Sequence, residues 1–454
     1  MKISNEIEIF SGQWKICGDD TFFNGNLLVD RKNNQIKLNL FKLEEVFSFS
    51  KSIREKLKTG KYIQGKLFSG EYITLYKCIY LNHRFVFDTS YMEFNIQVMY
   101  AFWGLNIDDN PHLTLEKIKI NFGDNIIDWY KLHYFSFTKP EQYNNNTFNI
   151  EVTRNNSIKL PYNEQLTITF SPSISNGWSL NKRELPLRRD VFVIFEYQSE
   201  TEWEKILDDI LSIQYFIGLG TKQKIQVATI QYLHYISPVG KKYQELYDDI
   251  ILGTGEINTN IDNPEYLFNL PEFNDFSNWK VQYEKLKPIL DLYFVIYTNI
   301  QIEIGFLLLI QALETFHARF TTYSKKDYID KIENLLSNGT NNELLYIDKD
   351  KNKDEYKKYF TLRERISDLC YANGNIPFPQ NNYQELIKKL VRTRNYYTHY
   401  DEKRKEEGIF TISELLNVIR FLKSLLEYHI LIIIGFDDKF IKDKMMDIRK
   451  SLIF

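Results

Sequence analysis

A short segment near the C-terminal end carries the residue types that metal-free RNA cleavage requires. Arg394 is followed directly by Asn395, and His399 comes four residues after Asn395. A histidine titrates near neutral pH, so it can take a proton from a 2′-hydroxyl or give one to a leaving 5′-oxygen. An arginine stays charged and offers a forked donor to a phosphate group that gains negative charge. The segment therefore predicts phosphoryl-transfer chemistry on RNA, with no metal and no other cofactor.

The spacing of these residues limits how their side chains can meet. Asn395 and His399 are four residues apart and share one face of a helix. Arg394 and His399 lie roughly 140° apart around an ideal helix. They converge if the helix ends or bends near Thr398, or if the long Arg394 side chain wraps round. Two chains could instead pool the residues across a two-fold axis, which favours a homodimer or a higher homo-oligomer.

Basic and aromatic residues flank the segment. The positive charges suit phosphates, although Asp401 and Glu402 dilute them. The tyrosine rings suit stacking on unpaired bases, and packing into a core is the competing interpretation. A solvated helix end with an arginine and a capping histidine is the alternative for the whole segment. The residues predicted to bind RNA are Lys388, Lys389, Arg392, Tyr396 and Tyr397, and Tyr400 is predicted to support the site.

The C-terminal half has the periodicity of helices. Apolar residues recur every three to four positions from Ser277 onward, and 306–316 is strongly apolar. A helix is predicted over 383–400, where it carries the segment described above. Thr411 and Glu414 form a capping-box pattern for a long final helix, with Gly435 at its C-terminal end. This half predicts an all-α, up-and-down bundle of four or five helices.

The N-terminal half has the periodicity of strands. Apolar and polar residues alternate in short runs separated by turn-forming residues, which predicts an antiparallel β-sandwich-like or barrel domain. Ser199 and Glu202 have the spacing of a capping box before an amphipathic helix. The predicted fold class is α+β. The predicted boundaries are a β-rich domain over 1–240, a linker or loop over 241–276 and a helical domain over 277–454.

Composition and charge exclude several classes of protein. The 454 residues carry a net charge of −3, so any nucleic-acid contact must use a local basic patch. The three cysteines, Cys17, Cys78 and Cys370, are far apart and form no metal-binding or disulfide pattern. No apolar leader or membrane-spanning stretch is evident in the sequence. We therefore expect a cytoplasmic protein that makes no contact with a membrane.

Several segments resemble one known family. Arg394, Asn395 and His399 match the Arg-Asn/Asp/His-x-x-x-His signature of HEPN ribonucleases. The 306–317 segment, which includes Glu314, resembles the helix that precedes this signature in ApeA-like HEPN domains. The segments that resemble the ApeA N-terminal domain are 12–14, 25–28, 65–75 and 125–129. Both resemblances lie in the order sheet domain, then HEPN domain.

The resemblance implies an endoribonuclease of anti-phage defence that acts by abortive infection. HEPN enzymes work without a metal, usually as dimers, and leave a 2′,3′-cyclic phosphate and a 5′-hydroxyl; transfer RNA is a common target. By resemblance, Arg394 would stabilise the transition state, His399 would be the acid and base, Asn395 would orient them and Glu314 would support Arg394. The N-terminal domain would sense a phage-encoded trigger or regulate the enzyme.

Two other classes of function remain open. The first is a catalytically silent HEPN module that binds RNA or a protein partner. The second is a sensor whose sheet domain recognises a phage protein, a sugar or a nucleotide, with a helical bundle that only dimerises. The intact set of Arg394, Asn395 and His399 favours the enzyme.

Overall fold

The structure is a computed structural model of the 454-residue chain. It divides into two compact units, one of residues 1–221 and 225–272 (the sheet unit) and one of residues 222–224 and 273–454 (the helical unit). The described residues are 7–43, 54–57, 62–86, 91–107, 112–130, 135–138, 149–152, 156–176, 187–239, 242–253, 266–273, 276–298, 300–339, 345–347, 358–371, 383–400, 406 and 408–451.

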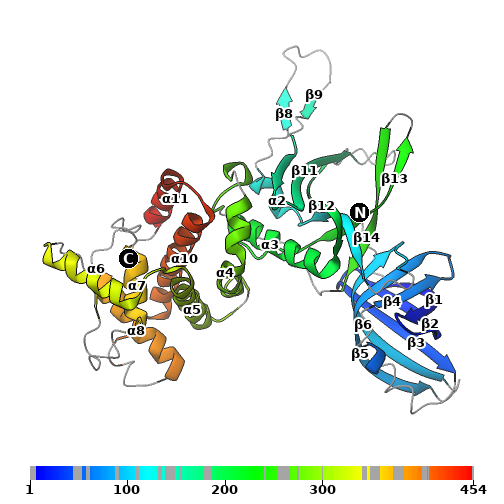
Figure 1. The fold of residues 1–454 in the computed structure, drawn as a ribbon, viewed down its shortest axis with the longest axis horizontal. Helices are drawn as coiled ribbons and strands as arrows, with labels where there is room; N and C mark the ends of the chain where they lie inside the picture. The colour runs from blue at the N-terminus through cyan, green and yellow to red at the C-terminus, as the bar shows by residue number, and fades with distance from the viewer. Residues whose placement is uncertain are drawn as a thin grey trace. The chain divides into compact units, whose positions relative to one another are not determined.

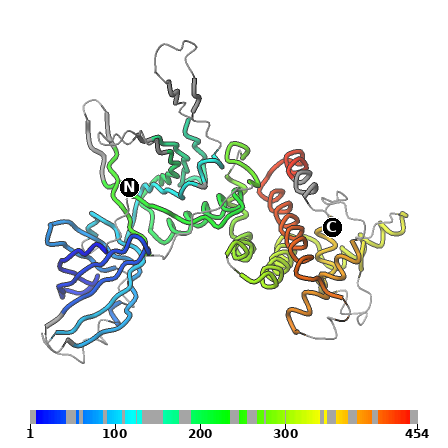
Figure 2. The backbone as a smooth tube through the Cα atoms, turned by 180° about the vertical axis from the view of Figure 1, so that it is seen from behind, coloured from blue at the N-terminus to red at the C-terminus, as the bar shows by residue number. Residues whose placement is uncertain are grey.

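The first part of the sheet unit is a closed antiparallel barrel (Figures 1 and 2, blue to light blue). Its strands lie in the order β1-β2-β3-β6-β5-β4, and β4 pairs back onto β1. Closure leaves most of these strands paired on both edges, which protects them from association. The strands are β1 Glu8–Ile16, β2 Phe22–Asp30, β3 Gln35–Leu43, β4 Tyr62–Leu67, β5 Tyr72–Val86 and β6 Tyr91–Trp103.

Trp14 fills the centre of the barrel. Its indole is fully buried, and its Nε1 donates a hydrogen bond to the Gly25 carbonyl at 3.1 Å. Two glycines make room for the ring. A Cβ atom on Gly65 would lie 2.2 Å from the indole, and one on Gly25 would lie 2.9 Å from it. The apolar residues of the surrounding strands, among them Leu38, complete the core.

The sheet continues beyond the barrel through a second set of antiparallel strands. From β6 the order is β14-β13-β7-β12-β11-β10, and the crossover from β12 to β13 contains helix α3, Trp203–Thr221. Trp129 of helix α2, Asn125–Trp129, is buried against Phe216 of α3 and Phe268. The strands are β7 Thr114–Asn121, β10 Ile158–Pro161, β11 Leu166–Asn176, β12 Leu187–Glu202, β13 Thr229–Val239 and β14 Lys242–Leu252, and a separate hairpin joins β8 Phe135–Thr138 to β9 Asn149–Val152.

Two predictions for the sheet unit are wrong in detail. The linker predicted over 241–276 begins too early, because 242–252 is strand β14 and pairs with β13 from Lys242 to Ile250. Ser199 and Glu202 are not a capping box, because β12 continues to Glu202 and the helix begins only at Trp203. The Glu202 carboxylate lies 3.1 Å from His112 instead of turning back onto the backbone.

The helical unit is built around two long apolar helices. Helix α5 buries Phe306, Leu309 and Leu313, and helix α10 buries a matching stripe. Both pack against helix α4, which contains Pro288 well inside its length. The elements of this unit are α4 Phe276–Val295, α5 Ile302–Phe320, α6 Lys325–Ser337, α7 Leu362–Tyr371, α8 Tyr383–His399, α10 Ile412–Ile434 and α11 Asp438–Ser451, and a 3-10 turn η1, Leu270–Glu272, ends the sheet unit.

The predicted fold class is confirmed, with an antiparallel sheet and barrel followed by a helical domain. The capping box at Thr411 and Glu414 is confirmed, and Gly435 adopts the left-handed conformation at the end of α10. The helices α7 and α11 were not expected from the sequence. In the described part of the chain, no helix is long and apolar enough to cross a membrane.

Candidate active site

The candidate site lies on the C-terminal half of α8. The buried residues Tyr383, Ile387, Leu390 and Thr393 form one stripe along this helix and fix its rotation against the bundle. The Thr393 hydroxyl donates to the Lys389 carbonyl at 2.8 Å and accepts from the Phe410 backbone N–H at 3.1 Å. This pair of hydrogen bonds ties the end of α8 to the segment that leads into α10.

The structure brings Arg394, Asn395 and Glu314 together. Arg394 Nη1 donates to Asn395 Oδ1 at 3.2 Å, and Nη2 lies 3.8 Å from the Glu314 carboxylate of α5. About a third of each charged side chain is exposed, at 34% for Arg394 and 29% for Glu314. The guanidinium is therefore held between two elements while it keeps N–H groups toward solvent. Such an arrangement suits a cation that must meet a phosphate.

His399 is the last residue of α8, and its side chain is exposed. Tyr400 follows with a φ of +50°, and this left-handed residue ends the helix. Helix α8 runs through Thr398 and ends at His399. The Thr398 hydroxyl donates to the Arg394 carbonyl at 2.8 Å, a side-chain hydrogen bond back onto the preceding turn of the helix. Arg394 and His399 thus leave one helix roughly 140° apart and about 7.5 Å apart along its axis.

The three tyrosines of the segment form an edge-to-face cluster. The Tyr396 ring centroid lies 5.1 Å from that of Tyr397 and 5.9 Å from that of Tyr400. Tyr397 also contacts Phe306 of α5, and burial raises the pKa of its hydroxyl. Tyr400 is 70% exposed. Packing therefore accounts for much of Tyr397, whereas the Tyr400 ring remains open to a ligand.

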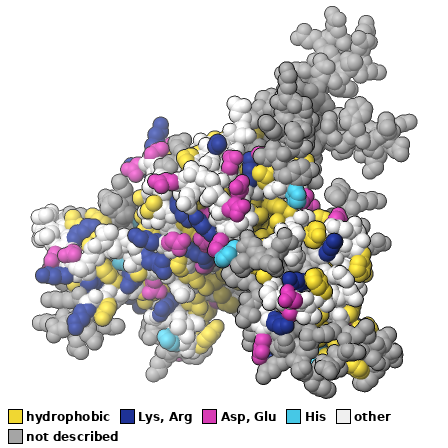
Figure 3. Space-filling view, turned by 45° about the vertical axis from the view of Figure 1, so that its right-hand side comes forward, with side chains coloured by type: hydrophobic (Ala, Val, Ile, Leu, Met, Phe, Trp, Pro, Cys, Tyr) yellow, Lys and Arg dark blue, Asp and Glu magenta, His cyan; other side chains and the backbone are white. Residues whose placement is uncertain are grey.

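The flanking lysines are partly neutralised. Lys388 lies 3.4 Å from Glu385, and Lys389 lies 2.8 Å from Glu414. The Lys389 hydrogen bond is the largest cause of the lowered pKa of Glu414. Arg392 is partly buried on the same helix. Figure 3 shows basic and acidic side chains interspersed over the described surface that it draws, so a purely positive groove does not cover that face.

A buried polar network that the sequence analysis missed lies one helical turn beyond Glu314. His317 Nε2 is 3.0 Å from the Asp368 carboxylate, which also accepts from the Tyr323 hydroxyl. Arg365 Nη1 lies 3.3 Å from His317 Nδ1. Arginine can only donate, so Nδ1 is the acceptor and Nε2 carries the proton. The Glu314-x-x-His317 spacing on one apolar helix was the available signal.

The network fixes α5 against α7 close to the carboxylate that meets Arg394. Burial and the nearby Asp368 raise the pKa of Tyr323, which keeps it a donor. His429 of α10 packs on Phe316 and donates to the Leu369 carbonyl at 2.9 Å. Burial lowers the pKa of His429 to about 4. Among the described residues, no group of three or more histidine, cysteine or acidic side chains has the geometry of a metal site.

Comparison with known families places both units. Residues 9–279 match the model of ApeA N-terminal domain 1, and residues 307–440 match that of the Apea-like HEPN domain. A sheet-and-barrel domain followed by a HEPN domain is the class that fold and sequence define together. The first match covers more than half of the chain, and the chain belongs to the ApeA family. Glu314, Arg394 and His399 all lie inside the HEPN match. No curated protein and no solved structure is significantly similar to the chain.

Proposed function

We propose that the protein is a metal-independent HEPN endoribonuclease of anti-phage defence, which acts by abortive infection. The HEPN domain is of a type linked to RNases in such defence. The observation that carries the proposal is the placement of Arg394, which Asn395 and Glu314 hold on the helix that ends at an exposed His399.

In the proposed reaction, the 2′-oxygen attacks the adjacent phosphorus and the bond to the 5′-oxygen breaks. His399 takes the 2′-hydroxyl proton or returns a proton to the leaving 5′-oxygen. Arg394 stabilises the extra negative charge on the phosphoryl oxygens, and Asn395 orients its guanidinium. The products are a 2′,3′-cyclic phosphate and a 5′-hydroxyl. Transfer RNA is the target class that we propose, because the resemblance favours it.

Dimerisation is part of the proposal. One regular α8 points Arg394 and His399 in directions roughly 140° apart, so a phosphate cannot easily meet both within one chain. A two-fold axis close to the end of α8 would bring Arg394 of one copy to His399 of another. The exposed Tyr400 ring lies beside His399 in the sequence and would border such a site.

The direct test incubates purified protein with total cellular RNA in EDTA and analyses the ends of any fragments. We expect discrete fragments with cyclic-phosphate ends from the wild-type protein and none from His399→Ala. The matched control is His112→Ala, which removes another exposed histidine from the sheet unit and should cleave as the wild type does.

If the purified protein alone does not cleave RNA, the assay is repeated with extract from phage-infected cells. The reason is that we assign to the sheet unit a regulatory role and the recognition of a phage-encoded trigger, which such an extract contains. Cleavage that appears only with this extract, and only with His399 present, supports the proposal. Cleavage that persists in His399→Ala, or fragments with 3′-hydroxyl ends, would overturn it. Absence of cleavage by every protein even with the extract favours the alternative, a HEPN module that binds RNA or a partner without cutting.

A further inference from the structure

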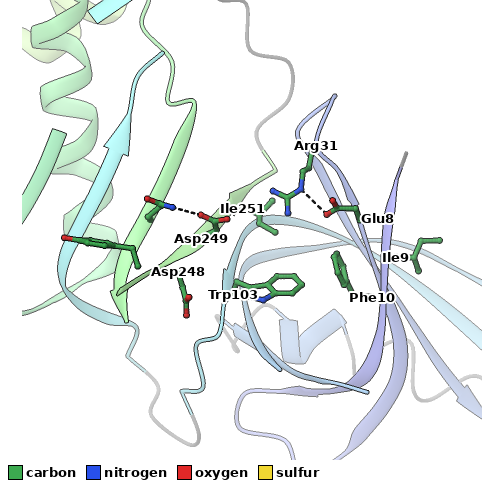
Figure 4. Close-up of a pocket in the computed structure, with 10 residues that line it drawn as sticks. Glu8, Ile9, Phe10, Arg31, Trp103, Asp248, Asp249 and Ile251 are labelled. Carbon is green, nitrogen blue, oxygen red and sulfur yellow. Dashed lines mark hydrogen bonds and ion pairs between the residues drawn. The ribbon is translucent and has the colours of Figure 1, made fainter. Parts of the chain in front are cut away.

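A cavity of about 660 Å³ opens in the sheet unit, where the barrel meets the second set of strands (Figure 4). Its volume lies in the range of ligand-binding cavities in proteins. Strand β1 forms one wall, strand β14 forms another, and the Trp103 side chain at the end of β6 lies between them. The residues that line it include Glu8, Phe10, Arg31, Trp103, Asp248 and Asp249.

Two strand edges next to this cavity have no strand partner within the described chain. Strand β1 pairs with β2 from Glu8 onward, but with β4 only over Gly12–Ile16. Strand β14 pairs with β13 over Lys242–Ile250, but with β6 only over Ile250–Leu252. The second edge of 242–249 therefore offers backbone N–H and C=O groups that another strand can pair with.

The lining residues place these open edges at the cavity itself. Successive side chains of a strand point to opposite faces of the sheet. Tyr247, Asp248 and Asp249 are consecutive, yet all three line the cavity. Glu8, Ile9 and Phe10 are also consecutive and all line it. A cavity that meets both faces of a strand reaches around its edge, so it exposes the pairing groups of β1 and β14.

The walls specify the chemistry of an added strand. Phe10 and Trp103 form an edge-to-face pair with ring centroids 4.8 Å apart, which is a platform for an apolar side chain. Glu8, Asp248 and Asp249 contribute three carboxylates. Among the described residues that line the cavity, Arg31 is the one Lys or Arg, and it already lies 3.0 Å from Glu8. Asp248 and Asp249 make the wall formed by β14 acidic.

The carboxylates of β14 have neutral or weakly basic neighbours. Asp249 Oδ1 accepts from the Gln231 amide at 2.9 Å, and Asp248 Oδ2 lies 2.8 Å from His234 Nδ1. Asp248 is 35% exposed, so it remains open to a cation from solvent. A lysine or arginine beside these groups would gain a charge-assisted hydrogen bond.

We propose that this cavity binds an extended, basic peptide segment of another protein, which adds as a strand along the open edge of β14. A lysine or arginine side chain faces Asp248 or Asp249, which point to opposite faces of the sheet, and an apolar side chain rests on Trp103 and Phe10. Main-chain pairing supplies affinity and the side-chain positions supply selectivity. The proposal goes beyond RNA cleavage and does not depend on it, because binding is measured without any RNA.

The experiment measures fluorescence anisotropy of a labelled octapeptide of alternating arginine and valine with the full-length protein. Two further peptides carry backbone N-methyl groups on every second residue, one on the arginines and one on the valines. Alternate N–H groups of a strand point to the same edge. We expect the unmodified peptide to bind and one methylated peptide, but not the other, to lose at least about tenfold in affinity, which is ~1.4 kcal/mol.

Protein variants test the charges. Asp248→Asn with Asp249→Asn should weaken the Arg–Val peptide about tenfold, and a Glu–Val peptide should not bind to the wild type. The matched control is Glu116→Gln, an exposed acid on β7 outside the cavity lining, which should bind as the wild type does. Unchanged binding by the double variant overturns the proposal, and so does absence of binding to the wild type. Equal binding of both methylated peptides would indicate a site that binds the cation alone, and would also overturn the proposal. This comparison uses only the wild-type protein, so it remains valid if the double variant fails to fold.

Discussion

The side chain of Arg394 is held by two modest contacts. Its ion pair with Glu314 is long, at 3.8 Å, and both partners are about one-third exposed. Such a pair contributes at most about 1 kcal/mol. We expect Glu314→Gln to lower kcat for RNA cleavage about fivefold, whereas Arg394→Ala should lower it by about 10² to 10³. Glu314→Asp should recover part of the loss, which a merely structural role of Glu314 would not produce.

The readout that separates positioning from catalysis is the pH profile of kcat. Loss of Glu314 should leave the profile unchanged, because the titrating group of the proposed mechanism is His399 and not the carboxylate. A shifted profile in Glu314→Gln would assign Glu314 to proton transfer and contradict the positioning role.

His429 makes the stability of the helical unit depend on pH. Its pKa is about 4 in the folded chain and 6.5 in a free histidine. Below pH ~6.5, His429 binds a proton in the unfolded chain but stays neutral in the folded chain. The free energy of unfolding therefore falls as the pH drops toward 4. Above pH ~6.5 the full stability is present. We expect the loss to reach about 1 to 3 kcal/mol, measured by urea unfolding between pH 7 and pH 4.5.

His429→Gln is the matched variant, because an amide can still donate to the Leu369 carbonyl. It should flatten the dependence of the unfolding free energy on pH between 5 and 6.5, whatever its absolute stability. An equal slope in the variant and the wild type would show that groups other than His429 cause the dependence.

The site residues that could be predicted from the sequence are mainly those that lie close together along the chain. Arg394, Asn395 and His399 lie within one helical segment, and Glu314 stood out as an acid in an apolar helix. The network of Arg365, His317 and Asp368 could not be inferred in the same way. Its members are separated by up to 51 residues, and the packing of α5 on α7 alone brings them together.

Among the elements, the barrel strands have a sharp steric requirement at Trp14. A Cβ atom on Gly65 would lie 2.2 Å from the indole, and the indole is enclosed on every side by core residues. We expect Gly65→Ala to destabilise the sheet unit by about 1 to 3 kcal/mol, the usual cost of overpacking. Thermal unfolding followed by tryptophan fluorescence measures the change.

The control for this prediction is a second substitution at the same contact. Trp14→Leu alone leaves a cavity and should itself be destabilising. Combined with Gly65→Ala, it should cost less than the sum of the two single changes, because the shorter side chain frees the space that Cβ needs. If the two losses in unfolding free energy simply add, Gly65 is required for its backbone conformation and not for its contact with Trp14.

Elements with strong local signals were predictable and the rest were not. The caps of α10 and the periodicity of α8 are local, so both helices were placed to within about one residue of the structure. Strand β14 has the polar run Tyr243 to Asp249 and resembles a loop in sequence. Its conformation depends on pairing with β13, and closure of the barrel depends on the pairing of β1 with β4. Such long-range pairing leaves little trace in a local pattern.

In the whole molecule, the chain crosses the boundary between the two units more than once. Residues 222–224 belong to the helical unit, although the sheet unit continues after them to residue 272. Lys222 Nζ lies 3.4 Å from Glu427 Oε2, and the buried Glu427 also accepts from the Tyr293 hydroxyl at 2.6 Å. Loss of one partner of a buried ion pair typically costs about 3 to 5 kcal/mol. Deleting the first 240 residues would therefore disturb the helical unit as well as remove the sheet unit.

Full-length chains can test the shared site without any truncation. Co-expressed Arg394→Ala and His399→Ala chains, each with its own affinity tag, are purified through both tags in succession. If a site takes Arg394 from one copy and His399 from the other, a mixed dimer has one site with both residues and one with neither. We expect it to recover up to about half of the wild-type cleavage rate per dimer, while each variant alone stays inactive.

The control is a mixed dimer of two His399→Ala chains with the same two tags, which should remain inactive. If each chain builds its own site, the Arg394→Ala and His399→Ala mixture has no complete site and remains inactive as well. That outcome would mean that Arg394 reaches a phosphate beside its own His399, against the directions in which a regular α8 sends the two side chains.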